Sequence, residues 1–367
     1  MPSFPQKPRR SGAASAARAS ARPRGDVPAL VRLGAALALL ALAALGVAAC
    51  GGTSEGSDDS GDGGGSVDLV AYSTPEEAYT DDLQPGFNAT SDGEGVEFSN
   101  SFGSSGDQSR AVEAGQSADV VHFAIEPDIT RLVDAGMVAE DWNQNEYNGI
   151  VEDSVVVFAV RKGNPENIQT WDDLITGDVE VLTPNPFTSG GARWNLMAAY
   201  GNKTLTEGAS EEEGLQYISD LLNNVSVQDE SARDALGTFL GGKGDVLLAY
   251  ENEAIAAQDA GEEIDYVVPD STILNETPIA ATTEADESAQ PFIDYLYTDE
   301  AQQLWADKGY RPVVESVLKQ NEDKFPTPPD LFTIADLGGW DEVTTEFFDP
   351  ESGSIAEIEA NLGVPTE

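Results

Sequence analysis

Short apolar segments alternate with helical patterns along this chain from Val67 onward. The first strand-like segments are Val67 to Ser73, Val96 to Ser99 and Ala118 to Ala124, and each leads into a helical pattern. The alternation restarts after Lys162-Gly-Asn-Pro165. Strands that alternate with helices form mostly parallel sheets with helices on both faces. We therefore predict an α/β protein with two lobes, each a mostly parallel sheet flanked by helices.

Three strand-to-helix junctions have the composition of an anion site. In one, the strand-like Val179 to Leu182 leads through Thr183-Pro-Asn-Pro186 to a helix that opens in Ser189-Gly-Gly191. The first N–H groups of a helix have no partner inside it, and the peptide dipoles add partial positive charge there. Ser99 to Asp107 and Glu230 to Ala235 have the same character. Each alone is more simply a helix cap or a turn, but three together predict a shared site beyond the strand ends.

The amino terminus has the pattern of an export signal. Seven basic residues precede the apolar run from Leu33 to Ala49, which ends in Val47-Ala-Ala-Cys50. This resembles a bacterial lipoprotein signal, so we expect residues 1–49 to be removed and Cys50 to be lipidated; a buried thiol is the alternative. Residues 50–66 then form a flexible acidic linker. We expect a lipoprotein in the periplasm or on the outer face of the cytoplasmic membrane, with its lipid anchor as the only membrane contact.

The net charge limits the partners that this chain can have. It contains 19 basic and 66 acidic residues. Residues 1–50 hold seven of the basic and one of the acidic residues, so the mature chain keeps 12 and 65, a net charge of about −53. Such a surface argues against nucleic acid and anionic lipid as partners. An anion must then be held by close, buried donors. With one cysteine there is no intrachain disulfide, and we expect no metal, no cofactor and a monomer.

Five motifs along the chain belong together. They are Ser154-Val-Val-Val-Phe-Ala-Val-Arg-Lys-Gly-Asn-Pro165, Thr183-Pro-Asn-Pro186, Ser189-Gly-Gly-Ala-Arg-Trp-Asn195, Gly244-Asp-Val-Leu-Leu-Ala-Tyr-Glu-Asn-Glu-Ala254 and Tyr310-Arg-Pro312. In combination they resemble one family, the sulfate- and thiosulfate-binding proteins that feed bacterial ABC importers. The resemblance implies a type II periplasmic-binding-protein fold with the ligand in the cleft between lobes. Lobe 1 is expected to comprise residues 67–156 with 278–367 and lobe 2 residues 157–277, with crossover hinges near 154–161 and 273–282.

The resemblance also implies the residues that bind the ligand. Ser105 lines up with a hydroxyl and amide donor of the family. The other donors are implied to be Ser189, Gly190, Gly191 and Ala232. Tyr250 stands where the family commonly has a Trp donor, and Ser73 replaces an Asp that usually orients donors. Arg193 and Arg233 are expected to support the helix-start peptides, with surface ion pairing as the alternative.

The chemistry of the guest favours sulfate, with thiosulfate as a further candidate, over phosphate. Sulfate carries no proton at neutral pH and needs donors only, whereas a carboxylate acceptor recognises the proton on phosphate. Phosphate, molybdate and tungstate remain the alternatives. Catalysis is not expected, because His122 is the only histidine and reads as a structural strand-end residue. An adhesion or display protein would bind no small ligand. The expected protein partner is an ABC permease.

Overall fold

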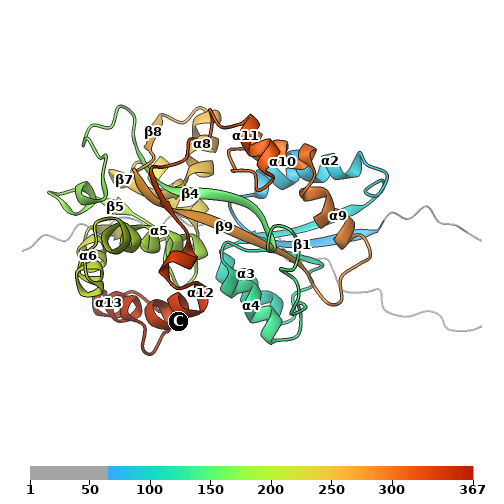
Figure 1. Cartoon of the computed structure of the whole chain (residues 1–367), viewed down its shortest axis with the longest axis horizontal. Coiled ribbons are helices and arrows are strands. Elements are labelled where there is room, and N and C mark those ends of the chain that lie inside the picture. The colour runs from blue at the N-terminus through green and yellow to red at the C-terminus, as the bar shows by residue number, and fades with distance from the viewer. Residues whose placement is uncertain (1–64, 367) are drawn as a thin grey trace, which may run out of the picture. The chain divides into compact units, whose positions relative to one another are not determined.

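The structure, a computed structural model, describes residues 65–366 (Figure 1). The predicted signal peptide, Cys50 and nearly all of the predicted linker lie outside these residues. No helix in the described part of the chain combines the length and the apolar character that a membrane span requires. The expectations about export and lipid attachment therefore stay predictions.

The first strand group consists of three parallel strands, with β1 (Ser66–Tyr72) between β2 (Glu97–Gly103) and β3 (Val120–His122). The chain between these strands is helical, as the alternation predicts. The helices that follow the three strands are α1 (Glu76–Ala78), η1 (Tyr79–Leu83) and α2 (Gln84–Asn88), then α3 (Ser105–Glu113), then α4 (Glu126–Asp134).

The second strand group repeats this plan, with β5 (Val181–Leu182) parallel to both β6 (Val225–Val227) and β7 (Val246–Tyr250). Its helices are η2 (Trp171–Ile175), α5 (Gly190–Gly201), η3 (Asn202–Thr206), α6 (Glu211–Asn223), α7 (Ala232–Leu240) and α8 (Glu251–Asp259). Strand β8 (Ile264–Val267) pairs antiparallel with the end of β4.

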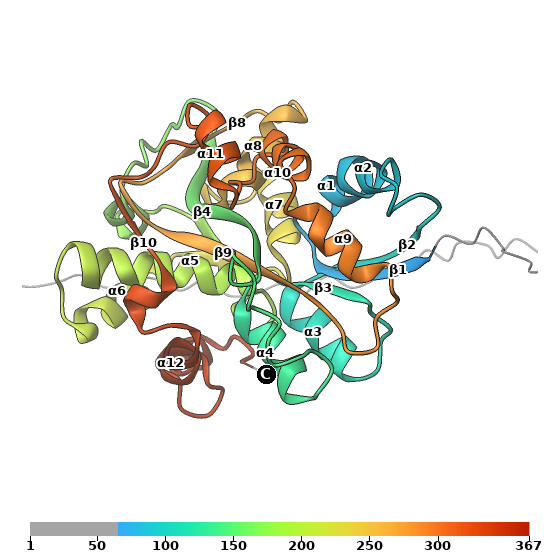
Figure 2. The ribbon, with the colours of Figure 1, turned by 45° about the vertical axis from the view of Figure 1, so that its right-hand side comes forward.

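Two long strands, β4 (Ile150–Arg161) and β9 (Ser271–Ala281), join the two groups. They pair antiparallel with each other, β9 continues beside β3, and β4 continues beside β7. The strand order is β2-β1-β3-β9-β4-β7-β5-β6, and both views show β4 and β9 crossing between the groups (Figures 1 and 2). All four antiparallel pairings involve β4 or β9, so each strand group is parallel, as predicted.

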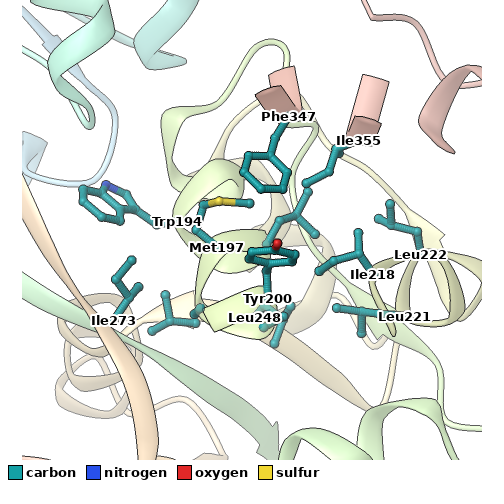
Figure 3. Packing of buried hydrophobic residues seen from close by; sticks show 14 of the residues in the cluster. Trp194, Met197, Tyr200, Ile218, Leu221, Leu222, Leu248, Ile273, Phe347 and Ile355 are labelled. Atoms are coloured by element: carbon teal, nitrogen blue, oxygen red, sulfur yellow. The ribbon is translucent and has the colours of Figure 1, made fainter. Parts of the chain in front are cut away.

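Helix α5 is the centre of the largest hydrophobic cluster (Figure 3). Every residue of α5 except Arg193 is buried, so this helix must be covered on all sides. Trp194, Met197 and Tyr200 on α5 pack with residues of α6 and of the carboxyl-terminal segment, including Phe347 and Ile355.

The carboxyl-terminal segment contains β10 (Asp330–Phe332), η4 (Ile334–Leu337), α12 (Trp340–Val343), η5 (Thr344–Phe348) and α13 (Ser354–Leu362). Its packing differs from the prediction that residues 278–367 all belong to lobe 1. From Phe332 to Ala356 its buried apolar side chains lie in the cluster around α5 and α6, because α5 is buried on nearly all sides and this segment supplies part of its cover. The lobe boundaries otherwise stay a prediction.

The remaining helices are α9 (Ala289–Leu296), α10 (Asp299–Asp307) and α11 (Glu315–Gln320). The sequence predicts one helix from Ser288 to Lys308, but the structure divides it. Thr298 accepts a hydrogen bond from the Ala301 N–H at 3.2 Å and caps a new helix. Side chains of α9 and α10 pack with those of β1 and η1 in a second hydrophobic cluster.

Candidate functional site

The three predicted helix starts meet at one small cavity. Helix α3 follows β2, α5 follows β5 and α7 follows β6, so all three begin beyond the carboxyl ends of parallel strands. The cavity is lined by Tyr72, Ser73, Gly103, Ser104, Ser105, Ala124, Ser189, Gly191, Ser231, Ala232 and Tyr250. These residues come from both strand groups. Of the predicted ligand-binding residues, only Gly190 is not part of this lining.

The cavity is compact and its lining is uncharged. The cavity has a volume of about 10 Å³, close to what a single ordered water needs. All eleven lining residues are Gly, Ala, Ser or Tyr. Two larger cavities, of about 670 and 860 Å³ by the same measure, are lined by many acidic and basic side chains instead. The small cavity is therefore the one whose chemistry matches the predicted anion site.

Main-chain N–H groups supply donors to this cavity. The N–H groups of Ser105, Gly190, Gly191 and Ala232 make no hydrogen bond to another atom within residues 65–366. Each lies in the first turn of its helix, where N–H groups project beyond the helix start and the dipole favours negative charge. Three such starts from facing strand groups form a concave set of neutral donors.

The hydroxyl groups of the lining divide into two sets. Four of them donate to carboxylates, in the pairs Ser104–Asp107 (2.5 Å), Ser105–Asp128 (2.6 Å), Ser231–Asp234 (2.7 Å) and Tyr72–Glu152 (2.6 Å). The hydroxyls of Ser73, Ser189 and Tyr250 bond to no other residue in the described part of the chain. These three are the hydroxyls available to a guest.

Ser105 is held differently from the role that the resemblance implies. Its Oγ donates to Asp128 and accepts from the Ala124 N–H at 2.9 Å, so this hydroxyl is fully engaged. Only the Ser105 amide remains for a ligand. Burial raises the pKa of Asp128, and the Ser105 hydrogen bond and nearby arginines oppose this shift. No local sequence pattern marks Asp128, because it is the packing of α3 on α4 that brings it to Ser105.

Tyr250, Ser189 and Ala232 converge on Gly191. A Cβ atom placed on Gly191 would lie 3.3 Å from Ser189 Oγ, 3.5 Å from Ala232 Cβ and 3.6 Å from the Tyr250 hydroxyl. Tyr250 is 1% exposed, and burial raises the pKa of its phenol well above the ordinary value. The phenol therefore stays protonated as a donor. Gly191 leaves open the space that these groups share.

Gly190 contributes to the close contact between the strand groups. A Cβ atom on Gly190 would lie 2.9 Å from Ala124 Cβ, so only glycine permits this approach. Trp194 Nε1 donates to the Ala124 carbonyl at 2.7 Å, and the Gly106 N–H donates to the Thr188 carbonyl at 3.0 Å. These contacts hold the elements around the cavity in a closed arrangement.

The two predicted supporting arginines lie outside the cavity lining. Arg193 Nε donates to the Pro186 carbonyl at 2.8 Å, just before α5, and burial lowers the pKa of Arg193 to about 10. Arg233 turns away from the start of α7. It makes two hydrogen bonds of 2.6 Å to the Glu77 carboxylate and one of 2.8 Å to the Thr74 carbonyl. Arg233 thus joins α7 to the chain that follows β1.

His122 is buried and structural in its contacts. Its Nδ1 lies 2.8 Å from the Tyr79 hydroxyl and its Nε2 lies 3.2 Å from Thr277 Oγ1. Burial lowers the pKa of His122 to about 3, so the ring is neutral. Within residues 65–366 no three His, Cys, Asp or Glu side chains gather as metal ligands would.

Residues 67–311 match the sequence model of a protein family, the bacterial extracellular solute-binding proteins. The chain belongs to this family. A sulfate-binding protein of Synechococcus elongatus is 40% identical over 322 residues, which cover 85% of this chain and 91% of that protein. A thiosulfate-binding protein of Escherichia coli is 34% identical over 268 residues, covering 70% and 79% of the two chains.

Among solved structures, the sulfate-binding protein SubI of Mycobacterium tuberculosis is 45% identical. It matches with a TM-score of 0.75, and the match covers 78% of this chain and all of that one. The resemblance stated from the sequence motifs is thereby confirmed. This solute-binding protein has the type II periplasmic-binding-protein fold that the resemblance implied.

Proposed function

We propose that this protein binds sulfate outside the cytoplasm and delivers it to the permease of an ABC importer, with thiosulfate as a second candidate ligand. Its family supports export and solute binding. Relatives named for sulfate and thiosulfate support the ligand class. The observation that carries the proposal is the cavity, in which eleven uncharged residues gather helix-start amides and free hydroxyls from both strand groups.

The donor set suits a fully deprotonated dianion. We propose that the N–H groups of Ser105, Gly191 and Ala232 and the hydroxyls of Ser189 and Tyr250 replace the water around sulfate. Ser73 lies beside them in the lining. Gly190 would contribute its N–H from the same turn of α5. Buried polar groups are costly unless they are hydrogen-bonded. A sulfate that accepts from all of these donors therefore gives hydrogen bonds both to the buried donors and to its own oxygens.

The absence of a carboxylate acceptor in the lining supports sulfate over a protonated oxyanion. No residue of the lining carries a carboxylate. Asp128, which accepts a hydrogen bond from the Ser105 hydroxyl, lies outside the lining. A phosphate that carries a proton would leave its own O–H without an acceptor. Phosphate is therefore the less favoured ligand. Molybdate and tungstate carry no proton either, and they stand behind sulfate because the relatives are named for sulfate.

We propose that closure of two lobes traps the ligand. Lobe 1 would contain residues 67–156 and the chain from residue 278 up to the carboxyl-terminal segment. Lobe 2 would contain residues 157–277 together with that segment, which packs on α5 and α6. The hinges would lie in β4 and β9, near 154–161 and 273–282. A ligand that bonds to both lobes favours the closed state by its differential affinity, and the permease would recognise that state.

The further parts of the proposal concern the setting of the protein. We propose that it acts as a monomer without metal or cofactor, that it catalyses no reaction, and that lipidated Cys50 holds it at the outer face of the membrane. The homologous solute-binding proteins support the absence of catalysis. Nucleic acid is not expected as a partner, because the mature chain is strongly acidic.

Isothermal titration of the purified protein with a panel of oxyanions tests the ligand. We expect sulfate to bind with a dissociation constant of about 1 μM or below, and phosphate, molybdate and tungstate to bind far more weakly. Tight phosphate binding with sulfate and thiosulfate inert would contradict the proposal.

Ser189→Asp is a variant that should lose sulfate binding in this titration. A carboxylate at this position would stand among the donors and repel a dianion, so sulfate binding should be lost. Ser226→Asp adds the same charge on an exposed residue of β6 and should leave the affinity unchanged. Retained binding in Ser189→Asp would place the site elsewhere.

A further inference from the structure

Behind the cavity lies a buried carboxylate that the proposed function does not use. Glu152 on β4 is fully buried, and its Oε1 accepts from the Tyr72 hydroxyl at 2.6 Å. Thr277 Oγ1 also donates to Oε1, while Oε2 has no hydrogen-bond partner in the described structure. Tyr72 lines the cavity. A single side chain therefore separates the Glu152 carboxylate from the space assigned to the anion.

In the described part of the chain, no cation lies close enough to offset a charge on Glu152. Its nearest basic group within residues 65–366 is His122, with Nε2 at 3.7 Å from Oε1, and that ring is neutral. The titratable groups around Glu152 are Tyr72 of β1, Tyr79 of η1, His122 of β3, Asp153 of β4, Tyr250 at the end of β7, and Tyr310. Arg311 bonds to Glu251 rather than to Glu152.

We propose that Glu152 is an affinity-determining residue of the anion site and takes up a proton from the solvent when the dianion binds. The inference rests on the proposed function. A dianion beside Tyr72 repels a negative charge on Glu152, and burial leaves little water to screen the two charges. The proton goes to a carboxylate oxygen of Glu152, and the buffer supplies it. The protonated carboxyl group keeps its hydrogen bonds and removes the repulsion.

The ionisation of the free protein sets the pH range of this effect. Burial raises the pKa of Glu152 to about 7, although the hydrogen bonds from Thr277 and Tyr72 lower it. A bound dianion would raise this pKa further. Since half of the Glu152 carboxyl groups are already protonated at pH 7, binding at this pH should take up at most about 0.5 proton per sulfate. By the same linkage, the affinity should be lower at pH 8 than at pH 6, by up to about tenfold.

Calorimetric titration with sulfate in buffers of different ionisation heat measures the proton uptake directly. The wild-type protein should take up protons on binding sulfate, and its affinity for sulfate should fall as the pH rises. Glu152→Gln should show neither, and at pH 8 it should bind sulfate more tightly than the wild type. Glu359→Gln removes another buried carboxylate, on α13, which accepts hydrogen bonds from Gln228 Nε2, and this variant should behave as wild type.

Tyr72→Phe provides a second variant if Glu152→Gln does not fold. It removes one hydrogen bond that stabilises the charged carboxylate, so the fall in affinity should move to higher pH. Sulfate binding without proton uptake in the wild type would overturn the inference and leave the proposed function intact. Uptake retained in Glu152→Gln, or an unchanged pH profile in Tyr72→Phe, would also overturn it. No sulfate binding at any pH would contradict both.

Discussion

At the scale of single residues, the site keeps negative charge one side chain away from its guest. Ser105 and Tyr72 line the cavity, and their hydroxyls donate hydrogen bonds to the carboxylates of Asp128 and Glu152 behind them. Ser189 and Tyr250 keep their hydroxyls for a guest. In a chain with 66 acidic residues, this division explains how an anion can be bound at short range.

Gly191→Ala should abolish tight sulfate binding. Its methyl group would enter the space between Ser189 Oγ and the Tyr250 hydroxyl, where a guest would otherwise lie. We expect a loss of affinity of about a hundredfold or more, measured by calorimetric titration. Gly237→Ala is the matched control, because its Cβ on α7 meets nothing within 4 Å. That control should bind normally and gain up to about 1 kcal/mol of stability. Normal binding by Gly191→Ala would exclude the cavity as the site.

At the scale of elements, sequence reasoning succeeded where the signal is local. Apolar strands followed by Gly and Ser predict the starts of α3, α5 and α7, because both strand and helix start are encoded within a few residues. Asp128 and Tyr72 could not be predicted as members of the site, since only the packing of separate elements brings them there. The break at Thr298 was not predicted because buried apolar residues lie on both sides of it, including Phe292, Leu296 and Trp305.

The carboxyl-terminal segment helps to cover α5. Phe347→Ala should lower the free energy of unfolding by about 3 to 5 kcal/mol, because this ring packs on Tyr200 with centroids 4.8 Å apart inside the largest cluster. Urea unfolding followed by fluorescence measures the change. Leu362→Ala, at a side chain 41% exposed, should cost far less. Equal effects would contradict the packing described for this segment.

Arg233 links two elements that the proposed closure brings together. Arg233→Gln should weaken sulfate binding about fivefold, because loss of its paired hydrogen bonds to Glu77 lowers the population of the closed state. Titration calorimetry gives the affinity, and small-angle scattering gives the compaction on adding sulfate. Lys319→Gln breaks an exposed ion pair with Glu315 on α11 and serves as the control. An unchanged affinity in Arg233→Gln would mean that this contact does not favour closure.

At the scale of the whole molecule, the chain joins an export pattern to a solute-binding domain. Residues 1–49 carry the signal pattern, and the family match begins at residue 67. Cys50→Ser should release the protein from membranes in fractionated cells of a bacterial host. Its affinity for sulfate should stay the same, since the binding residues all follow residue 66. Continued membrane attachment of this variant would contradict lipidation at Cys50.

The central claim is that neutral donors from both strand groups enclose a sulfate dianion in the cavity between Ser105, Gly191, Ala232 and Tyr250. Anomalous diffraction from crystals grown with selenate, a heavier analogue of sulfate, tests it most directly. The account predicts one strong selenium peak in this cavity, within hydrogen-bond distance of the helix-start N–H groups and the Tyr250 hydroxyl. A cavity without selenium, or one occupied by a cation, would contradict it.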